Sequence, residues 1–344
     1  MSEHKPQIKT LQSDKLDDFV SSLIDVCHVF APVRDCDQLV RIDTPRRVEL
    51  HHANTKLSPK SFFFPQTETL LIFDRKTGRA LDGDDGNHEK PLLLFGIHPC
   101  DARAFALMDR IFTSDAPPDP YYVKRRESAI TITLACTHPS PTCFCTSVGC
   151  APDAEDGADI ILFELEHRYL IKTLTPRGDT LIERAKEYMQ NATEADTREK
   201  DLLMKAANGQ LEQCFDCEML CEKLDEFDAP YWQELHPKCL GCGICTFLCP
   251  TCHCFDITDE VLKRLGRRVR TWDSCMFPLF TQHASGHNPR PTQKERLRQR
   301  IMHKFNYTKK CYDETFCVGC GRCILYCPVN IDIRQLIKEI LEEQ

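Results

Sequence analysis

The chain has 344 residues, 22 of them cysteine, and a formal net charge of −8 at pH 7 with a pI near 5.9. This acidic balance argues against nucleic acid as the main partner, because phosphate binding needs a basic field. The residues near the N-terminus lack the pattern of a signal peptide, and the longest apolar runs are far too short to cross a bilayer. We therefore expect a cytoplasmic protein without direct membrane insertion, in which so many reduced thiols indicate metal binding rather than disulfides.

The N-terminal half alternates between predicted helices and predicted strands. Apolar residues at helical spacing predict a helix from Leu16 to Phe30, which Ser13 would cap and Pro32 would end. Apolar runs predict strands at 69–75, 91–98 and 128–136, a helix at 101–112 and a hairpin at 159–174. Strands buried on both faces and alternating with helices indicate a mixed or partly parallel sheet.

A polar, charged segment at 176–212 is predicted to be helical, exposed and the link between two domains. The first, 1–212, is an N-terminal α/β domain with a candidate additional cluster. The second, 213–344, contains two cysteine runs separated by a long insertion and ends in a predicted helix at 333–344. The predicted fold class is therefore α+β, with a mixed α/β domain followed by a helical domain like that of bacterial ferredoxins.

The two runs, CLGCGICTFLCP (239–250) and CVGCGRCILYCP (317–328), form an internal repeat and match the CxxCxxCxxxCP pattern of two-cluster ferredoxins. The spacing lets three thiolates of a run reach one [4Fe–4S] cluster and carries the fourth cysteine to the other cluster. Zinc is the alternative, but it prefers paired CxxC knuckles with four ligands per site. One cluster is predicted at Cys239, Cys242, Cys245 and Cys327, and the other at Cys317, Cys320, Cys323 and Cys249.

Four distinctive phrases are spread along the chain: NTKLSPKSFFFPQTE (54–68), FGIHPCDARAFALMDRIF (95–112), PTCFCTSVG (141–149) and CLGCGICTFLCPTCHCFDI (239–257). In these phrases the chain resembles the β subunits of cytoplasmic sulfhydrogenases, the corresponding iron–sulfur subunit of anaerobic sulfite reductase, and related iron–sulfur subunits. The resemblance implies an electron-transfer subunit of a hetero-oligomeric complex. It would relay single electrons between a flavoprotein that uses FAD and NAD(P)H and a catalytic subunit of the hydrogenase, sulfite reductase or heterodisulfide reductase type.

The HPCD and PTCFCT phrases carry candidate ligands of a third [4Fe–4S] cluster. Cys100 follows one predicted strand, Cys136 ends the next, and Cys143 and Cys145 lie in the loop beyond it. Cys150 is a fifth candidate in this loop and makes the ligand set ambiguous. A fourth site would draw on the CxxCxxxC run of Cys214, Cys217 and Cys221 together with one further cysteine.

Cys252 and Cys254 follow directly on the first ferredoxin run, and several roles are open to them. They could pack near the cluster that Cys249 binds and tune its potential, or form a redox-active dithiol. In the second case the chain would itself be a catalytic sulfur or disulfide reductase, as it would with an open-site cluster. Cys275 and Cys311 also stay without an assigned role.

No catalytic residue is assigned, and the GxGxxG, GxxxxGK[ST] and GxSxG patterns are missing from the sequence. Nucleotide binding by this chain therefore has no basis in a motif, and flavin binding through an unorthodox loop stays open. Cys27 and Cys36 are expected to be unligated, packing as small apolar side chains.

Overall fold

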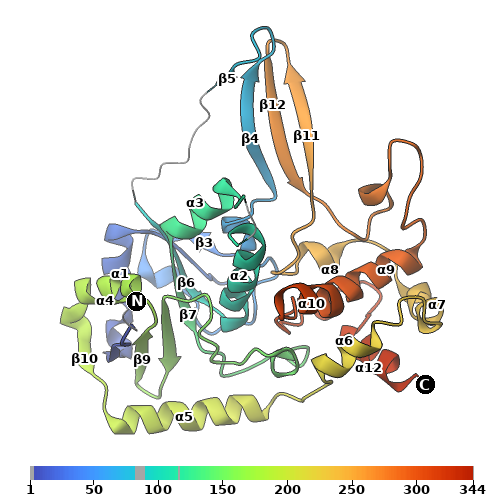
Figure 1. The fold of residues 1–344 in the computed structure, drawn as a ribbon. Helices are drawn as coiled ribbons and strands as arrows, with labels where there is room; N and C mark the ends of the chain where they lie inside the picture. The colour runs from blue at the N-terminus through green and yellow to red at the C-terminus, as the bar shows by residue number, and fades with distance from the viewer. Residues whose placement is uncertain (1–3, 82–89, 115–116, 344) are drawn as a thin grey trace.

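The computed structural model describes residues 4–81, 90–114 and 117–343. The N-terminal part is built round an eight-stranded mixed sheet with the strand order β10-β1-β9-β8-β7-β6-β2-β3 (Figure 1). Strands β2, β6, β7 and β8 are parallel neighbours, and the remaining pairs are antiparallel. The strands are β1 Ile8–Gln12, β2 His28–Ala31, β3 Val40–Arg41, β6 Leu92–Ile97, β7 Ala129–Leu134, β8 Ile160–Glu164, β9 Arg168–Thr173 and β10 Met189–Asn191.

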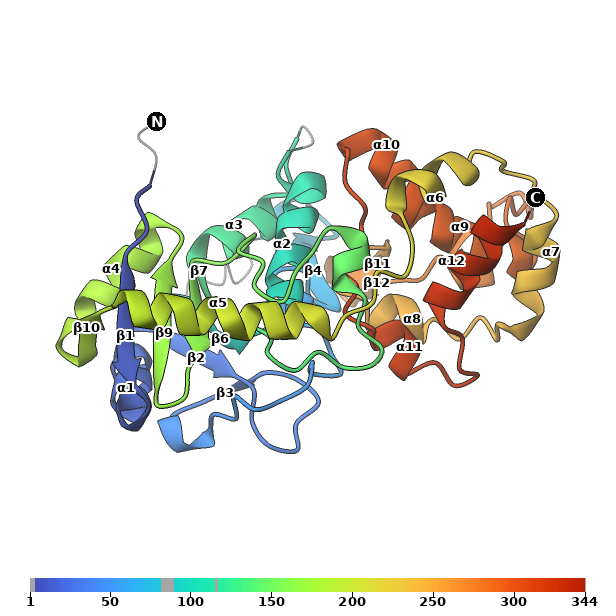
Figure 2. The same ribbon diagram turned by 90° about the horizontal axis from the view of Figure 1, so that it is seen from below.

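Helices cover both faces of this sheet. Phe19 of α1 and Leu181 of α4 pack with Ile132 of β7 in one core, whereas Phe105 of α2 packs with Leu94 of β6 in another. Helix α5 runs past the sheet and leads toward the C-terminal helices (Figure 2). The helices are α1 Leu16–Val26, α2 Pro99–Phe112, α3 Pro120–Ser128, α4 Pro176–Arg184 and α5 Glu194–Gly209.

Several sequence predictions hold here, and two do not. The segment 176–212 is not an exposed helical linker throughout, because α4 buries Leu181 and Ile182 in the core and Met189–Asn191 pairs with β1. The mixed sheet, the helix after 91–98 and the hairpin at 159–174 are confirmed, the last as the antiparallel pair β8 and β9. The predicted first helix is too long, since α1 ends at Val26 and His28 begins β2. Val29 and Phe30 fit the helical spacing, but they pair with β6, so tertiary pairing overrides the local pattern.

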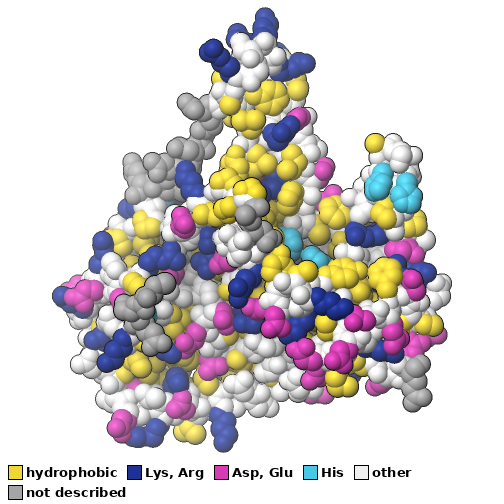
Figure 3. All heavy atoms as spheres, viewed as in Figure 1, with side chains coloured by type: hydrophobic (Ala, Val, Ile, Leu, Met, Phe, Trp, Pro, Cys, Tyr) yellow, Lys and Arg dark blue, Asp and Glu magenta, His cyan; other side chains and the backbone are white. Residues whose placement is uncertain are grey.

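A second sheet projects from the body as a ribbon in the order β11-β12-β4-β5 (Figure 1). The insertion between the cysteine runs forms the hairpin β11–β12, and β12 pairs antiparallel with β4 from the N-terminal part. Apolar side chains cover much of the ribbon face in Figure 3, with Lys and Arg at its tip. The strands are β4 Thr67–Asp74, β5 Ala80–Leu81, β11 Phe255–Leu262 and β12 Leu265–Trp272.

The C-terminal part is a set of short helices packed round a core in which Trp232, Phe305 and Ile337 are buried, and Phe144 of the N-terminal part also packs into that core. The two cysteine runs lie in the loops that begin α8 and α11, and a π-helical turn at His303–Tyr307 joins α9 to α10. The α+β class is therefore confirmed, and no helix within the described ranges is long and apolar enough to span a membrane. The helices are α6 Cys217–Lys223, α7 Tyr231–Leu235, α8 Ile244–Phe247, α9 Gln293–Met302, α10 Thr308–Tyr312, α11 Arg322–Leu325 and α12 Ile333–Glu342.

Candidate metal centres

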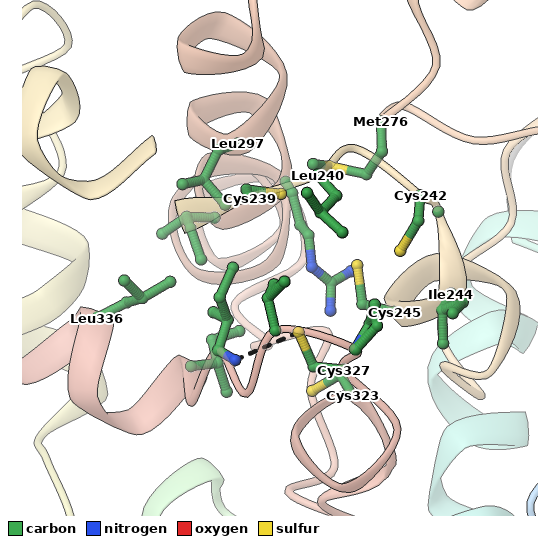
Figure 4. A pocket seen from close by; sticks show the side chains of 17 residues that line it. Cys239, Leu240, Cys242, Ile244, Cys245, Met276, Leu297, Cys323, Cys327 and Leu336 are labelled. Atoms are coloured by element: carbon green, nitrogen blue, oxygen red, sulfur yellow. Dashed lines mark hydrogen bonds between the residues drawn. The ribbon is translucent and has the colours of Figure 1, made fainter. Parts of the chain in front are cut away.

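The four cysteines predicted to bind the first cluster line one pocket (Figure 4). Three come from the loop that precedes α8 and from α8 itself, and Cys327 comes from the turn after α11. Two of these sulfurs accept hydrogen bonds. The Gln293 side-chain amide donates to Cys239 Sγ at 3.2 Å, and the Ile331 backbone N–H donates to Cys327 Sγ at 3.2 Å. Such N–H···S contacts orient thiolate ligands and favour their charged form.

Glycine is required where the first run turns. Gly243 has a φ of +76°, and a Cβ there would stand 2.7 Å from the Phe277 ring. Gly321 has the equivalent position in the second run, and it also has a positive φ.

The cysteines predicted for the second cluster also lie together. The Cys317 and Cys323 thiols both interact with Cys249 and with Cys320. Burial raises the pKa of Cys317 to about 12, and the nearby Cys249 adds to the shift. The Lys304 ammonium group, whose Nζ lies 3.1 Å from Cys249 Sγ, acts in the opposite direction and lowers the pKa of Cys317. The thiols are thus close, buried and in need of a positive counter-charge if they are to ionise.

Three buried cations provide that charge. Lys60, Arg300 and Lys304 are 2%, 5% and 4% exposed, and none of them forms an ion pair with a carboxylate of the described residues. Arg300 interacts with the thiols of Cys245 and Cys323, which belong to different predicted clusters. Burying a cation without a counter-ion costs several kcal/mol of folding free energy, because the charge loses its hydration. The cost is similar to that of removing one partner from a buried ion pair. The arrangement therefore fits anionic, thiolate-ligated iron–sulfur clusters at both sets of cysteines.

Within the described ranges, no three or more His, Cys, Asp or Glu side chains converge closely enough to hold a single metal ion. A zinc ion draws its four ligands to about 2.0–2.3 Å.

The four cysteines predicted for a third cluster line a pocket of their own in the N-terminal part. Cys100 begins α2 after β6, and Cys136 follows β7, so the parallel strands bring them to the same edge of the sheet. Cys143 and Cys145 complete the set from the next loop. Burial raises the pKa of Cys143 to about 11 and lowers the pKa of His98, which lines the same pocket, to about 4.

Cys150, the fifth candidate, does not line this pocket. Its backbone N–H donates to the Cys145 carbonyl at 3.0 Å, and its thiol lies 3.8 Å from the Ala151 carbonyl oxygen. Cys150 therefore closes the turn that carries Cys145, but its thiol also interacts with those of Cys100 and Cys145, so Cys150 stays a candidate ligand beside Cys100, Cys136, Cys143 and Cys145.

The third pocket and the second ferredoxin run share a wall. Cys320 lines the pocket, its carbonyl accepts from the Asn54 side chain at 3.2 Å, and the Phe144 backbone N–H donates to the Gly319 carbonyl at 2.8 Å. A Cβ on Gly319, whose φ is +61°, would stand 2.4 Å from the backbone nitrogen of Cys145. The two loops are thus packed backbone against backbone.

A buried ion pair holds the same contact. Arg322 makes two hydrogen bonds of 2.8 Å to the Asp101 carboxylate, and its Nε donates to the Thr55 carbonyl at 2.7 Å. Asp101 is in α2 directly after Cys100, and Arg322 lies between Cys320 and Cys323. The bidentate geometry therefore fixes one predicted cluster site against the other.

Comparison with known proteins supports iron–sulfur binding by the two cysteine runs of the C-terminal part. Residues 238–331 match the family model of a 4Fe-4S dicluster domain. Over 340 residues the chain is 33% identical to sulfhydrogenase 2 subunit beta of Pyrococcus furiosus, an alignment that covers 96% of this chain and 98% of that protein. The chain belongs to the sulfhydrogenase β-subunit family. The resemblance given by the sequence is thereby confirmed, and so is an iron–sulfur redox subunit that carries [4Fe–4S] clusters.

In this member of the sulfhydrogenase β-subunit family, the remaining predicted set is dispersed. The Cys214 thiol faces the Glu212 carbonyl at 3.5 Å, and the Cys217 thiol faces the Ser147 carbonyl at 3.1 Å. Cys221 is contacted by the Asn306 side chain. The three thiols have three different neighbours, so this further site stays a prediction without support from the geometry.

Sequence reasoning missed the buried cations and the role of Arg322. Lys60 and Lys304 lie in phrases, SPKSFFFP and IMHKFNY, where a lysine interrupts apolar residues. That interruption is the signal that could have indicated a buried lysine. Arg322 offered a weaker signal, because arginine at a position inside a ferredoxin loop reads equally well as a solvated side chain.

Proposed function

We propose that this chain relays single electrons through three [4Fe–4S] clusters, between a flavoprotein that uses FAD and NAD(P)H and a catalytic redox subunit. The observation that carries the proposal is the shared wall: Cys320, a predicted ligand of the second cluster, also lines the pocket of the third set. Contact between sites allows an electron to pass from one to the next without any rearrangement of the chain.

Each predicted cluster has its own residues in this proposal, and when bound it supplies one-electron chemistry. The proposed domains divide accordingly, with the third set in 1–212 and the other two in 213–344. The three sets are Cys239, Cys242, Cys245 and Cys327; Cys317, Cys320, Cys323 and Cys249; and Cys100, Cys136, Cys143 and Cys145.

The residues round the sets supply positive charge and hydrogen-bond donors. Lys304 donates to Cys249, Gln293 donates to Cys239, and Arg300 stands between thiols of the first and second sets. These groups do not move during electron transfer in this proposal; they hold the thiolates in one orientation and favour the reduced state of whatever those thiolates bind.

The first set is the proposed contact with a partner protein. Cys242 is exposed, and the neighbouring Leu240 is 68% exposed. An apolar side chain at the surface beside a redox centre suits a protein partner that covers it. The relative in Pyrococcus furiosus is named as a subunit of a sulfhydrogenase, which supports a hetero-oligomeric complex for this chain as well. The hydrogenase, sulfite reductase and heterodisulfide reductase types of catalytic partner stay open.

Iron and acid-labile sulfide per chain, measured on anaerobically purified protein, test the number of clusters. We expect about twelve irons from three cubanes, and about eight in the Cys143→Ser/Cys145→Ser variant. Cys311→Ser, at an exposed cysteine outside all three sets, is the matched control and should keep the wild-type content. About eight irons in both wild type and double variant would remove the N-terminal part from the relay.

A second assay separates the relay from the catalytic alternative. The isolated chain, given an artificial electron donor, should exchange electrons with a flavoprotein but should not reduce sulfite, polysulfide or a disulfide at a catalytic rate. Turnover of any of these by the isolated chain would overturn the relay-only proposal.

A further inference from the structure

We propose that Cys254 and Cys275 form a redox-active dithiol–disulfide pair that exchanges two electrons with the cluster bound next to it at Cys249. The inference rests on the proposed relay, because the electrons reach the pair through that cluster. Cys254 and Cys275 belong to none of the three predicted ligand sets.

The β11–β12 hairpin brings the two thiols together. Phe255 is the partner of Trp272 in the ladder, and the Asp273 backbone N–H donates to the Cys254 carbonyl at 2.9 Å, which extends the pairing by one residue. The chain then turns back, so that Cys254 and Cys275 line the same small cavity, where their thiols interact. Both cysteines follow closely on the paired ends of one hairpin, so a disulfide between them would join neighbouring parts of the fold.

The partner differs from the one that sequence spacing suggests. Cys252 and Cys254 are the closest pair in the sequence, but the Cys252 thiol contacts Cys249 instead. Cys252 therefore lies between the predicted cluster ligand and the pair. Cys252 also lines the same cavity as Cys254 and Cys275.

The cavity that the two cysteines line is small. Cys252, Cys254 and Cys275 line a cavity of about 10 Å³ together with Arg300 and Lys304. That volume is about what one water molecule occupies, whereas the pockets at the first and third cysteine sets are larger, about 50 and 40 Å³.

Positive charge at the cavity supports the reduced form. Arg300 Nη1 lies 3.8 Å from Cys252 Sγ, and Lys60 Nζ donates to the Cys252 carbonyl at 2.9 Å. Neither cation has a carboxylate partner among the residues that the structure describes. Nearby unpaired cations stabilise thiolates, which are the species that form when a disulfide accepts electrons.

The proposed exchange conserves atoms and electrons. In the oxidised form, Cys254 Sγ and Cys275 Sγ are joined by one bond. Two electrons, delivered singly by reduced [4Fe–4S] clusters, break that bond, and two protons from solvent give two thiols. In the opposite direction the two protons leave, the sulfur–sulfur bond forms, and the two electrons return singly to oxidised clusters. Cys254 is partly exposed, which allows proton exchange with solvent, whereas Cys275 is 8% exposed.

The experiment measures the thiols directly in the anaerobic holoprotein. Samples poised at a series of potentials are acid-quenched, alkylated with a light reagent, reduced, alkylated with a heavy reagent and digested for mass spectrometry. We expect Cys254 and Cys275 to change label together, with a two-electron slope, and a peptide linked through these two residues in the oxidised sample. Thiols that keep the light label at every potential, or a peptide linked through Cys252, would overturn the pairing.

Variants separate this inference from the relay itself. Cys254→Ser and Cys275→Ser should keep the wild-type iron content and should take up two fewer electrons per chain in a full reductive titration. Cys311→Ser is the control and should keep both the wild-type iron content and the wild-type electron uptake. A loss of about four irons in Cys254→Ser or Cys275→Ser would mean that these residues bind a further cluster, which overturns the dithiol. If the wild-type protein binds no cluster at Cys249, the proposed relay is overturned as well. If the clusters are present but Cys254 and Cys275 form no disulfide, only this inference is overturned.

Discussion

Replacing Lys304 by methionine should lower the reduction potential of the cluster proposed at Cys249, Cys317, Cys320 and Cys323. The ammonium group is buried, and it donates at 3.1 Å to Cys249 Sγ, at 3.0 Å to Thr251 Oγ1 and at 2.8 Å to the Phe316 carbonyl. Burial disfavours its charge, but the surrounding thiolates outweigh that effect and raise the pKa of Lys304 above its ordinary value. It therefore stays charged at neutral pH and attracts an added electron.

The size of the effect follows from this contact. A unit charge 3.1 Å from the sulfur is worth about 5 kcal/mol at an effective dielectric constant of about 20. That figure is an upper bound, because the added electron spreads over the whole cluster. A charge-assisted hydrogen bond is worth roughly 1.5–3 kcal/mol. At about 59 mV for each tenfold change in a one-electron equilibrium, the expected fall is on the order of 60–130 mV.

An anaerobic redox titration followed by EPR measures this potential, with iron content as the test that the cluster is still bound. Lys304→Gln keeps two hydrogen-bond donors without the charge, so it should lower the potential by a smaller amount. Lys310→Met is the control, because Lys310 is exposed and pairs with Asp225. A Lys304→Met protein with full iron content and the wild-type potential would refute the electrostatic role that we give this lysine.

Three other changes have defined outcomes. Arg322→Leu leaves the Asp101 carboxylate buried without its partner, so the free energy of unfolding should fall by roughly 3–5 kcal/mol in anaerobic denaturant titrations; unchanged stability would contradict the role of this ion pair. Gly319→Ala places a Cβ 2.4 Å from the Cys145 backbone nitrogen, so iron content should fall by about four per chain, and full content would show that the loops tolerate separation. Burial lowers the pKa of His303 to about 4 from 6.5, so the unfolded chain binds more protons between these values and stability should decrease by up to about 3 kcal/mol as the pH falls from 6.5 to 4. Thermal unfolding of His303→Gln should lack this pH dependence, and an equally steep dependence in the variant would assign it to other groups.

Much of the local structure could be predicted because it depends on neighbours in the sequence. The hairpin at 159–174 shows strand-type residues on both sides of a short polar turn, and the structure has β8 and β9 there. The end of the first helix could not be predicted in this way. Val29 and Phe30 continue the helical spacing, but parallel pairing with β6 gives their backbone partners that a helix could not offer at that point.

The ribbon was missed for a related reason. Residues 255–272 carry alternating apolar positions, yet β11 is exposed along its whole length, so burial gives little signal. Its neighbour β12 pairs with β4 and so joins segments about 200 positions apart, such as Arg270 and Glu68, whose ion pair is buried. The contact becomes favourable only when both segments are held by the same body, which a local pattern cannot express.

The sequence by itself determined which cysteines are candidate cluster ligands, since the CxxCxxCxxxCP spacing is a local constraint on how thiolates can surround iron. Only the tertiary structure decided how the sets lie relative to one another and what surrounds them. Lys304 reaches Cys249 across 55 positions, Arg322 reaches Asp101 across 221, and Cys254 and Cys275 line one cavity. The physical reason is that buried charges and thiols interact through space, over distances that sequence separation does not encode.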